Sequence, residues 1–402
     1  MAGELGPLLA ELDALAARLE AARPCNIGFP GATDFDYSAL APLFIHHLLN
    51  NVGDPYVDGV AANHTKAMER VVVNFIADLL RAPADDRWGY VTTGASEGTL
   101  YALHLARSLH PGAVVYHSDA AHASVAKAVE LLAMPSIVVR TNTTGEMDYD
   151  DLADQLARRR DRAAVVVATI GTTMTEAVDD VRRITALLDE LAMRRRFVHA
   201  DAALSGIPLA LLDPGGRPGF DFADGADSLI VSGHKFIGSP IPCGVVVVKA
   251  SHRTRLASSL AYTGSPDVTI TGSRSGHAPL VLWYALRRLG VEGLRARADD
   301  SRALAEYTVQ SLVDSGWPAW RRPHAFTVVL DTPPPAVTTT WVLASHGGVS
   351  HIVCMPGVTR KQIDAFVADL TAAIQPTPAA TDNNNRRSGL LRRVRTTTST
   401  VT

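Results

Sequence analysis

The stretch SLIVSGHKFIGSPIPCGVVVV, residues 228–248, determines the expected fold. Two apolar runs, Ser228 to Val231 and Gly244 to Val248, flank a turn rich in glycine, serine and proline that carries Lys235. The runs are continuous rather than alternating, which is typical of strands covered by helices on both faces. The rest of the chain therefore has to supply further strands and the helices that cover them.

Similar apolar runs alternate with helical patterns before this stretch. The further runs are Ala113 to Tyr116, Ser136 to Val139, Ala164 to Ile170 and Phe197 to Ala200. Connections such as Tyr149 to Arg160 and Asp179 to Arg194 have helical pattern and length. This alternation predicts a large α/β domain with a mostly parallel central sheet, which we place at residues 65–280.

The pattern changes after residue 280. A helix is expected through Leu280 to Tyr307, followed by apolar runs at Phe326 to Leu330 and His351 to Met355. These elements predict a smaller α+β domain over residues 281–376. Residues 377–402 contain five arginines against one acidic residue and few apolar side chains, so a disordered tail is expected there.

Residues 1–64 precede this alternation and begin with a predicted helix. Leu8, Leu12, Leu15 and Leu19 recur at helical spacing and form one apolar stripe. Such a stripe has to pack against another apolar surface. The sequence leaves two partners open, the core of the same chain and a second subunit.

Composition excludes several classes of protein. The chain has 402 residues, of which 47% are hydrophobic and 20% charged, and its net charge is −3. This is typical of a soluble globular protein and predicts no nucleic-acid or membrane partner. The three cysteines, Cys25, Cys243 and Cys354, lie far apart, so neither disulfides nor a metal site is expected. The N-terminus lacks a basic region and no apolar stretch reaches the ~18 residues of a membrane span, so we expect a cytoplasmic location.

Two side chains near the ends of predicted strands indicate chemistry. Lys235 follows a strand, at the sheet edge where α/β proteins bind ligands, and a lysine among apolar neighbours can lose its proton and form a Schiff base with a carbonyl. Asp201 ends another strand and is followed by alanines, which suits pairing with a protonated pyridine nitrogen. Taken alone, Lys235 is more typical of a surface turn and Asp201 of a helix cap.

Two further segments complete a ligand site. Thr92 to Gly98 leads into a helical pattern and offers free backbone N–H groups to a phosphate, unless Ser96 is an ordinary N-cap. His122 follows a predicted strand, and its imidazole can lie over an aromatic ring or simply face solvent. The four segments together supply a phosphate cradle, a stacking ring, a partner for a pyridinium and an imine-forming amine. This combination predicts pyridoxal 5'-phosphate as the cofactor.

The chain resembles the group II pyridoxal-phosphate decarboxylases of fold type I, the aspartate aminotransferase-like fold. The resemblance is strongest to the branch of bacterial histidine decarboxylases and plant serine decarboxylases. It spans about Asn26 to Phe366 and rests on NIGFPGATDFDYSAL from Asn26, NNVGDPY from Asn50, WGYVTTGASEGTLYALHLAR from Trp88, ATIGTTMTEAVDD from Ala168, HADAALSG from His199, SGHKFIGSPIPCGVV from Ser232 and GSRSGHAPLVLWYAL from Gly272.

The resemblance implies roles around the cofactor ring. Lys235 would form the imine with the cofactor, and Asp201 would pair with the pyridine nitrogen. His122 would stack on one face of the ring, while Ala203 would lie against the other. Thr173 would lie near the ring hydroxyl or the aspartate.

The resemblance also implies a phosphate site and a proton donor. The phosphate would be surrounded by Gly94, Ala95, Ser96, Ser232 and His234. Tyr262, in the stretch Ala261 to Ser265, would correspond to a loop tyrosine that assists proton return to Cα. The catalytic residues implied are therefore Lys235, His122, Asp201 and Tyr262.

The activity implied is decarboxylation of an L-amino acid to its amine and carbon dioxide. Histidine, giving histamine, is the first candidate substrate, and the resemblance further implies a homodimer with active sites at the subunit interface. Two other functions stay open: a different reaction of the same cofactor, such as aldehyde synthesis, and a cofactor-binding scaffold without turnover.

One segment departs from the family pattern. After GDPY, relatives usually continue with a Ser-Asn-Tyr type triplet, whereas this chain has Gly59, Val60 and Ala61. The segment lies near the substrate entrance in the family, so Tyr56, Val60 and Ala61 are expected to contact the substrate in a roomier, more apolar pocket. A branched-chain or aromatic L-amino acid is therefore an alternative substrate.

Overall fold

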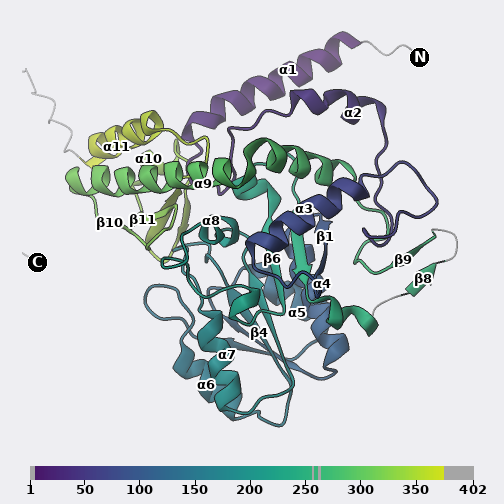
Figure 1. Ribbon diagram of the computed structural model, residues 1–402. Helices are drawn as coiled ribbons and strands as arrows, with labels where there is room; N and C mark the ends of the chain where they lie inside the picture. Colours follow the sequence, from purple (N-terminus) through teal and green to yellow (C-terminus); the bar gives the residue numbers. More distant parts are fainter. Residues whose placement is uncertain (1–4, 256–257, 261–263, 375–402) are drawn as a thin grey trace, which may run out of the picture.

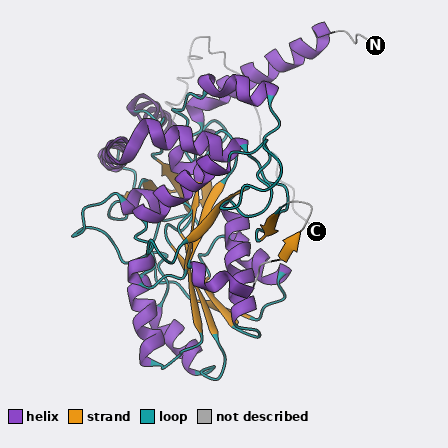
Figure 2. Cartoon of the chain, turned by 45° about the vertical axis from the view of Figure 1, so that its right-hand side comes forward, coloured by secondary structure: helices purple, strands orange, loops and turns teal. Residues whose placement is uncertain are grey.

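The computed structural model of the protein describes residues 5–255, 258–260 and 264–374 (Figure 1). The tail predicted over residues 377–402 lies outside this part of the chain. A seven-stranded sheet forms the centre, with helices on both of its faces (Figure 2). Its strands are β1 (Trp88–Thr92), β2 (Val114–Ser118), β3 (Ser136–Val139), β4 (Ala164–Thr169), β5 (Arg196–Asp201), β6 (Ser228–Ser232) and β7 (Gly244–Val248).

The order of the strands is β1-β7-β6-β5-β4-β2-β3. From β3 to β6 every neighbouring pair is parallel, which confirms the predicted mostly parallel sheet. Only β7 runs against both of its neighbours, β6 and β1. The six predicted strands form within one or two residues of their expected limits, whereas β1 was not predicted as a strand.

Helices that precede β1 or follow later strands cover the sheet. They are α3 (Lys66–Leu79), α4 (Ala95–Leu109), α5 (Ala123–Leu131), α6 (Tyr149–Ala157), α7 (Val181–Glu190) and α8 (Gly206–Ala210). Side chains of each strand alternate between two cores. In β4, Val165 and Val167 pack in the core that contains α4 and α5, whereas Val166 packs in the core that contains α3, α6 and α7. Both faces of the sheet are therefore buried under helices, as the continuous apolar runs predict.

A smaller domain follows, as expected. Its antiparallel sheet has the order β10-β11-β13-β12, from Ala319–Arg321, Thr327–Asp331, Val349–Val353 and Ala344–His346. The element α9 (His277–Asp314) consists of two helical segments joined by a kink at Gly290, and it reaches from the large domain into this one. There α10 (Pro335–Thr338) and α11 (Arg360–Ile374) complete the packing. The N-terminal segment joins this domain, because Ile27 is buried in its core. A short hairpin of β8 (Ser258–Leu260) and β9 (Ser265–Asp267) lies outside both sheets.

Helix α1 (Leu5–Ala22) buries none of its residues. It projects along the edge of the molecule together with the short helix α2 (Ala41–His46) (Figure 1). The predicted stripe of Leu8, Leu12, Leu15 and Leu19 is 41–60% exposed. Packing of this stripe in the core of its own chain, one of the two partners left open by the sequence, is therefore wrong for this structure.

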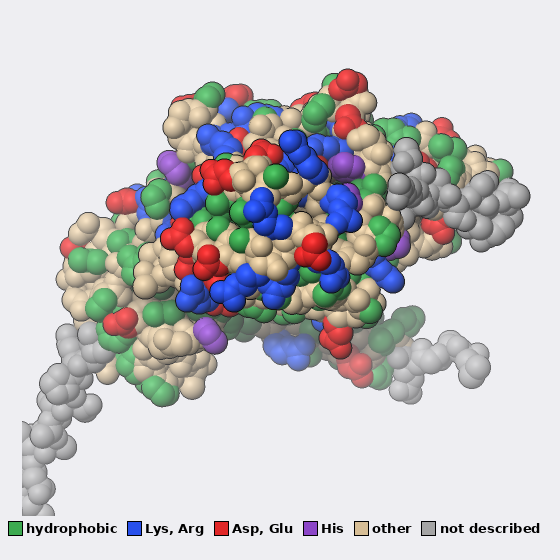
Figure 3. Space-filling model, turned by 90° about the horizontal axis from the view of Figure 1, so that it is seen from below, with side chains coloured by type: hydrophobic (Ala, Val, Ile, Leu, Met, Phe, Trp, Pro, Cys, Tyr) green, Lys and Arg blue, Asp and Glu red, His purple; other side chains and the backbone are tan. Residues whose placement is uncertain are grey.

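The surface mixes charges of both signs. The face drawn in Figure 3 has lysine and arginine side chains interspersed with aspartate and glutamate. Several arginines pair with acidic neighbours, as Arg196 does with Asp189 and Arg140 with Asp148. Across the described residues, no helix combines the length and the apolar composition that crossing a membrane would take.

Candidate active site

The predicted site residues gather where the central strands end. Asp201 is the last residue of β5, and Lys235 and His234 follow β6. Since β1 runs in the same direction as β6, the segment from Gly94 to Ser96 begins at this edge too. A cavity of about 180 Å³ opens there. Its lining includes all ten residues predicted to bind the cofactor, namely Gly94, Ala95, Ser96, His122, Thr173, Asp201, Ala203, Ser232, His234 and Lys235.

The turn that carries Lys235 is fixed by its backbone. Gly233 donates to the Cys243 carbonyl over 2.8 Å, and the Lys235 carbonyl accepts from the N–H of Ala32 over 3.0 Å. A Cβ at Gly233 would lie 2.6 Å from Sγ of Cys243, so the close approach requires glycine. Burial lowers the pKa of Lys235, opposed by the carboxylates of Asp201 and Glu176. The turn thus presents an amine that loses its proton more readily than an exposed lysine.

Asp201 ends β5, which pairs with β6, the strand that leads into the Lys235 turn. Only 5% of the surface of Asp201 is exposed. Its carboxylate accepts a hydrogen bond of 3.3 Å from the N–H of Ala203. His199, two residues earlier on β5, is fully buried, and its Nδ1 lies 2.8 Å from Oγ of Ser228. Burial lowers the pKa of His199 to about 4, so this ring is neutral near neutral pH. The carboxylate of Asp201 therefore faces the cavity, and the nearby His199 ring carries no positive charge that would pair with it.

The first turn of α4 faces the cavity. Helix α4 has Gly94 as its N-cap, without a side-chain cap, so Ser96 is not the ordinary N-cap considered from the sequence. The Glu97 carboxylate instead accepts from the N–H and the hydroxyl of Thr93. Backbone N–H groups at the start of a helix bind anions, so this end of the cavity suits a phosphate.

His122 is held in one orientation by the start of α5. Its Nδ1 accepts from the N–H of Ser124 over 3.2 Å and lies 2.8 Å from the Ser124 hydroxyl. Because Nδ1 is an acceptor, the proton of the neutral ring is on Nε2. The ring is a cap for α5 as well as a wall of the cavity, which sequence reasoning did not predict.

The polar groups of this cavity fit pyridoxal phosphate. The buried hydroxyls of Thr169 and Ser232 have no hydrogen-bond partner among the described residues, and both line the cavity. Buried hydroxyls without partners are costly, so they indicate a polar ligand. With a carboxylate, an amine of lowered pKa and a helix N-terminus around the same space, the donor set matches a phosphorylated pyridine aldehyde.

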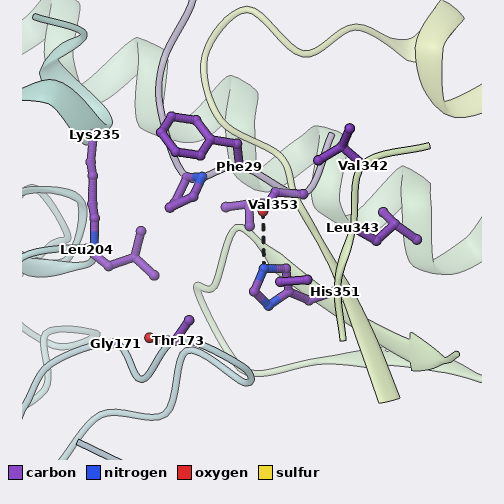
Figure 4. A pocket seen from close by; sticks show the side chains of 12 residues that line it. Phe29, Gly171, Thr173, Leu204, Lys235, Val342, Leu343, His351 and Val353 are labelled. Atoms are coloured by element: carbon purple, nitrogen blue, oxygen red, sulfur yellow. Dashed lines mark hydrogen bonds between the residues drawn. The ribbon is translucent and has the colours of Figure 1, made fainter. Parts of the chain in front are cut away.

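A second cavity of about 260 Å³ adjoins the first and shares Gly171, Thr173 and Lys235 with it. Figure 4 shows Lys235 on one side of this cavity and His351 on the other. Most of its other walls are apolar, from Phe29, Pro30, Leu204, Val342, Leu343 and Val353. His351 is 2% exposed, and its Nε2 lies 3.2 Å from the Gly28 carbonyl oxygen. This second cavity has the position of a site for the side chain of a substrate.

The three residues predicted to contact the substrate line neither cavity. Tyr56 is 38% exposed and Val60 is 75% exposed, and Ala61 is exposed as well. The expectation that these three residues contact the substrate stays a prediction. The apolar walls were missed because they come from the N-terminal segment and the small domain. The motif that begins at Asn26 contains Phe29 and Pro30 and could have indicated two of them. Tyr262 lies outside the described residues.

Comparison with known proteins gives a consistent result. The family model described as pyridoxal-dependent decarboxylase conserved domain matches residues 34–317. The histidine decarboxylase of Mesorhizobium japonicum is 45% identical over 361 residues, which are 90% of this chain and 97% of that protein. The histidine decarboxylase of Morganella morganii is 40% identical, over 86% of this chain and 92% of that protein. Among solved structures, L-methionine decarboxylase from Streptomyces sp. 590 is similar with a TM-score of 0.82 and 26% identity, over 90% of this chain and 94% of that chain.

Proposed function

The chain belongs to the pyridoxal-dependent decarboxylase family, and from this premise we propose that it converts L-histidine to histamine and carbon dioxide. The observation that carries the proposal is the position of Lys235 between two cavities, one suited to the cofactor and one to a substrate side chain. Histidine is favoured because the relatives that match nearly the whole chain are histidine decarboxylases.

The bound cofactor supplies an electron sink for the pair of electrons left on Cα when carbon dioxide departs. Lys235 would hold the cofactor through Nζ. Asp201 would pair with the pyridine nitrogen and favour its protonated form, which makes the electron sink effective. The N-terminus of α4, with Ser232 and His234, would bind the phosphate and so orient the ring.

A proton has to return to Cα after the carboxylate has left. Lys235 and His122 line the cofactor cavity and are two candidate donors, through Nζ and through Nε2. Tyr262 is the third candidate. Leu204 and Val353 are buried apolar walls on this side of Lys235, and they make the surroundings of the reacting centre less polar.

The second cavity has few polar groups that could recognise a side chain. Thr173 and His351 are the two polar side chains of its lining besides Lys235. Such a lining suits a flat ring with two hydrogen-bonding nitrogens such as imidazole, because Thr173 and His351 can each pair with one nitrogen. It also suits the branched-chain or aromatic alternatives, so the choice of histidine depends on the relatives.

The test is incubation of the protein, loaded with pyridoxal phosphate, with each of the twenty amino acids in turn. We expect carbon dioxide and histamine from histidine, detected by mass spectrometry, and much less amine from any other substrate. An aldehyde and ammonia in place of an amine would support the alternative chemistry. Absence of any product would support a scaffold without turnover, and an amine other than histamine would replace histidine as the substrate.

We further propose that the protein is a homodimer in which α1 packs against the second subunit. The exposed leucine stripe needs an apolar partner that the described part of its own chain does not offer. A groove of about 930 Å³ lies beside α1, lined in part by Leu19, Phe35 and Trp341. The exposure of Tyr56 and Val60 is consistent with contacts made only across the interface.

Replacement of Leu12 by aspartate is expected to weaken this dimer by about 10-fold or more, because it removes a buried leucine and places a charge in the interface. Sedimentation equilibrium at several concentrations measures the change. Ala17 lies on the opposite face of the helix, so Ala17→Asp is the matched control and should leave the dimer intact. Equal behaviour of the two variants, or a monomeric unmodified protein, would contradict this role for α1.

A further inference from the structure

Glu176 has two unusual properties for a carboxylate in a turn. Its backbone lies in the left-handed region, with a φ of 53°. Residues other than glycine and asparagine rarely adopt this conformation. It is also only 4% exposed. A strained backbone and a buried carboxylate both cost free energy, and their combination indicates that the side chain makes contacts that offset the cost.

Those contacts join the two domains. One carboxylate oxygen, Oε1, accepts from the Ser205 hydroxyl over 2.8 Å, at the start of α8 in the large domain. The other, Oε2, accepts from the backbone N–H groups of Phe326 and Thr327 over 3.0 and 2.8 Å, at the start of β11 in the small domain. All three donors are buried or nearly so, so Glu176 satisfies groups that have no access to water.

Each of these contacts lies directly behind a wall of the second cavity. On the large-domain side, Thr173 belongs to the same turn as Glu176, and Leu204 precedes Ser205. On the small-domain side, β11 is paired with β13, which carries His351 and Val353. Figure 4 shows Thr173 and Leu204 facing His351 across the cavity. The separation of these two walls therefore depends on the junction that Glu176 makes.

We propose that Glu176 is a positioning residue that sets the width of the substrate cavity by hydrogen-bonding its two walls together. The proposal deepens the decarboxylase function and depends on it, because it assumes that the second cavity receives the side chain of the amino acid. Glu176 lines neither cavity, so it acts through the walls and not on the reacting atoms.

The role of Glu176 requires acceptors for three hydrogen bonds. Burial raises the pKa of Glu176, whereas its hydrogen bonds with Thr327, Ser205 and Phe326 lower it. Lys235 and Arg302 are the basic groups whose pKa values its charge affects. A glutamine can reproduce all three contacts, because its oxygen can accept from both N–H groups while its amide donates to the Ser205 hydroxyl. A glycine relieves the backbone strain but leaves the three donors without an acceptor.

Glu176→Gly and Glu176→Gln therefore separate strain from hydrogen bonding. In Glu176→Gly we expect KM for histidine to rise about 10-fold or more while kcat changes less than about 3-fold, because Lys235, Asp201 and His122 all lie on the large domain. Glu176→Gln should keep KM within about 3-fold of the unmodified protein. Ala192 has a φ of 54° and lies on the surface after α7, so Ala192→Gly is the matched control for relief of strain and should change neither constant.

A second measurement does not need activity. Hydrogen–deuterium exchange in the protein without cofactor reports the N–H groups of Phe326 and Thr327 directly. We expect at least about 10-fold faster exchange in Glu176→Gly and near-normal protection in Glu176→Gln.

Unchanged KM and unchanged exchange in Glu176→Gly would overturn the proposal. So would a loss confined to kcat, because it would place the effect on the chemistry instead of on the cavity. These outcomes are distinct from failure of the proposed function, which the unmodified protein reveals by forming no histamine. If another amino acid proves to be the substrate, the same comparison of variants applies with that substrate.

Discussion

Lys235→Ala is expected to abolish amine formation, with a loss of kcat on the order of 10⁴-fold or more. Lys235 is the only lysine that lines either cavity at the described edge of the sheet, and burial lowers the pKa of its amine. Alanine removes both the covalent attachment of the cofactor and the nearest amine that can return a proton. The measurement is the rate of histamine formation at saturating substrate.

The covalent link itself can be mapped. Borohydride reduction of the unmodified protein, followed by peptide mapping, should place the cofactor on the peptide that contains Lys235, and Lys235→Ala should lose the visible absorbance of the bound cofactor. Lys127 is an exposed lysine on α5, so Lys127→Ala is the control and should retain both absorbance and activity. A label on a different side chain, or full activity in Lys235→Ala, would remove the basis of the proposed function.

The second large effect is expected at Asp201. Asp201→Asn keeps the size of the side chain but replaces a carboxylate that stabilises a protonated pyridine nitrogen with a neutral amide. We expect the variant to bind the cofactor and to lose activity on the order of 10³-fold, because the ring accepts the electron pair from Cα much less well without that proton.

The control for this variant has to be a carboxylate remote from the site. The Asp213 side chain is 95% exposed, so Asp213→Asn should behave as the unmodified protein. The measurements are the dissociation constant of the cofactor and kcat for histidine. Near-normal kcat in Asp201→Asn would contradict the role assigned to this residue, whereas loss of cofactor binding alone would make it a structural contact.

The sequence predicts the central sheet well for a physical reason. Strands buried on both faces are continuous apolar runs, and Ala164–Thr169 or Gly244–Val248 can be read from composition alone. The direction of a strand leaves no such signal, so the antiparallel pairing of β7 was not predicted. The strand β1, Trp88–Thr92, was missed because its tryptophan, glycine and tyrosine interrupt the aliphatic pattern.

Some residues of the candidate site could likewise be predicted from the sequence, and others could not. Residues that follow strands, such as Asp201 and Lys235, could be predicted because parallel strands bring their carboxyl ends to one edge. The second cavity as a whole could not be predicted, because Phe29 and His351 meet only after the N-terminal segment has joined the small domain. Glu176 gave no signal in the sequence, since its position in the left-handed region and its contact with β11 exist only in the folded chain.

The antiparallel pairing of β6 with β7 has a consequence for how the protein folds. These two strands are neighbours in the sheet and are joined by the turn that carries Lys235, so they form a local hairpin-like unit. Joining them closes a short loop, which costs little chain entropy, whereas β1 has to return from a distant part of the sequence to reach β7. The residue on which the chemistry depends thereby lies in a unit formed by contacts between segments close in sequence, to which the N–H of Ala32 adds a long-range hydrogen bond.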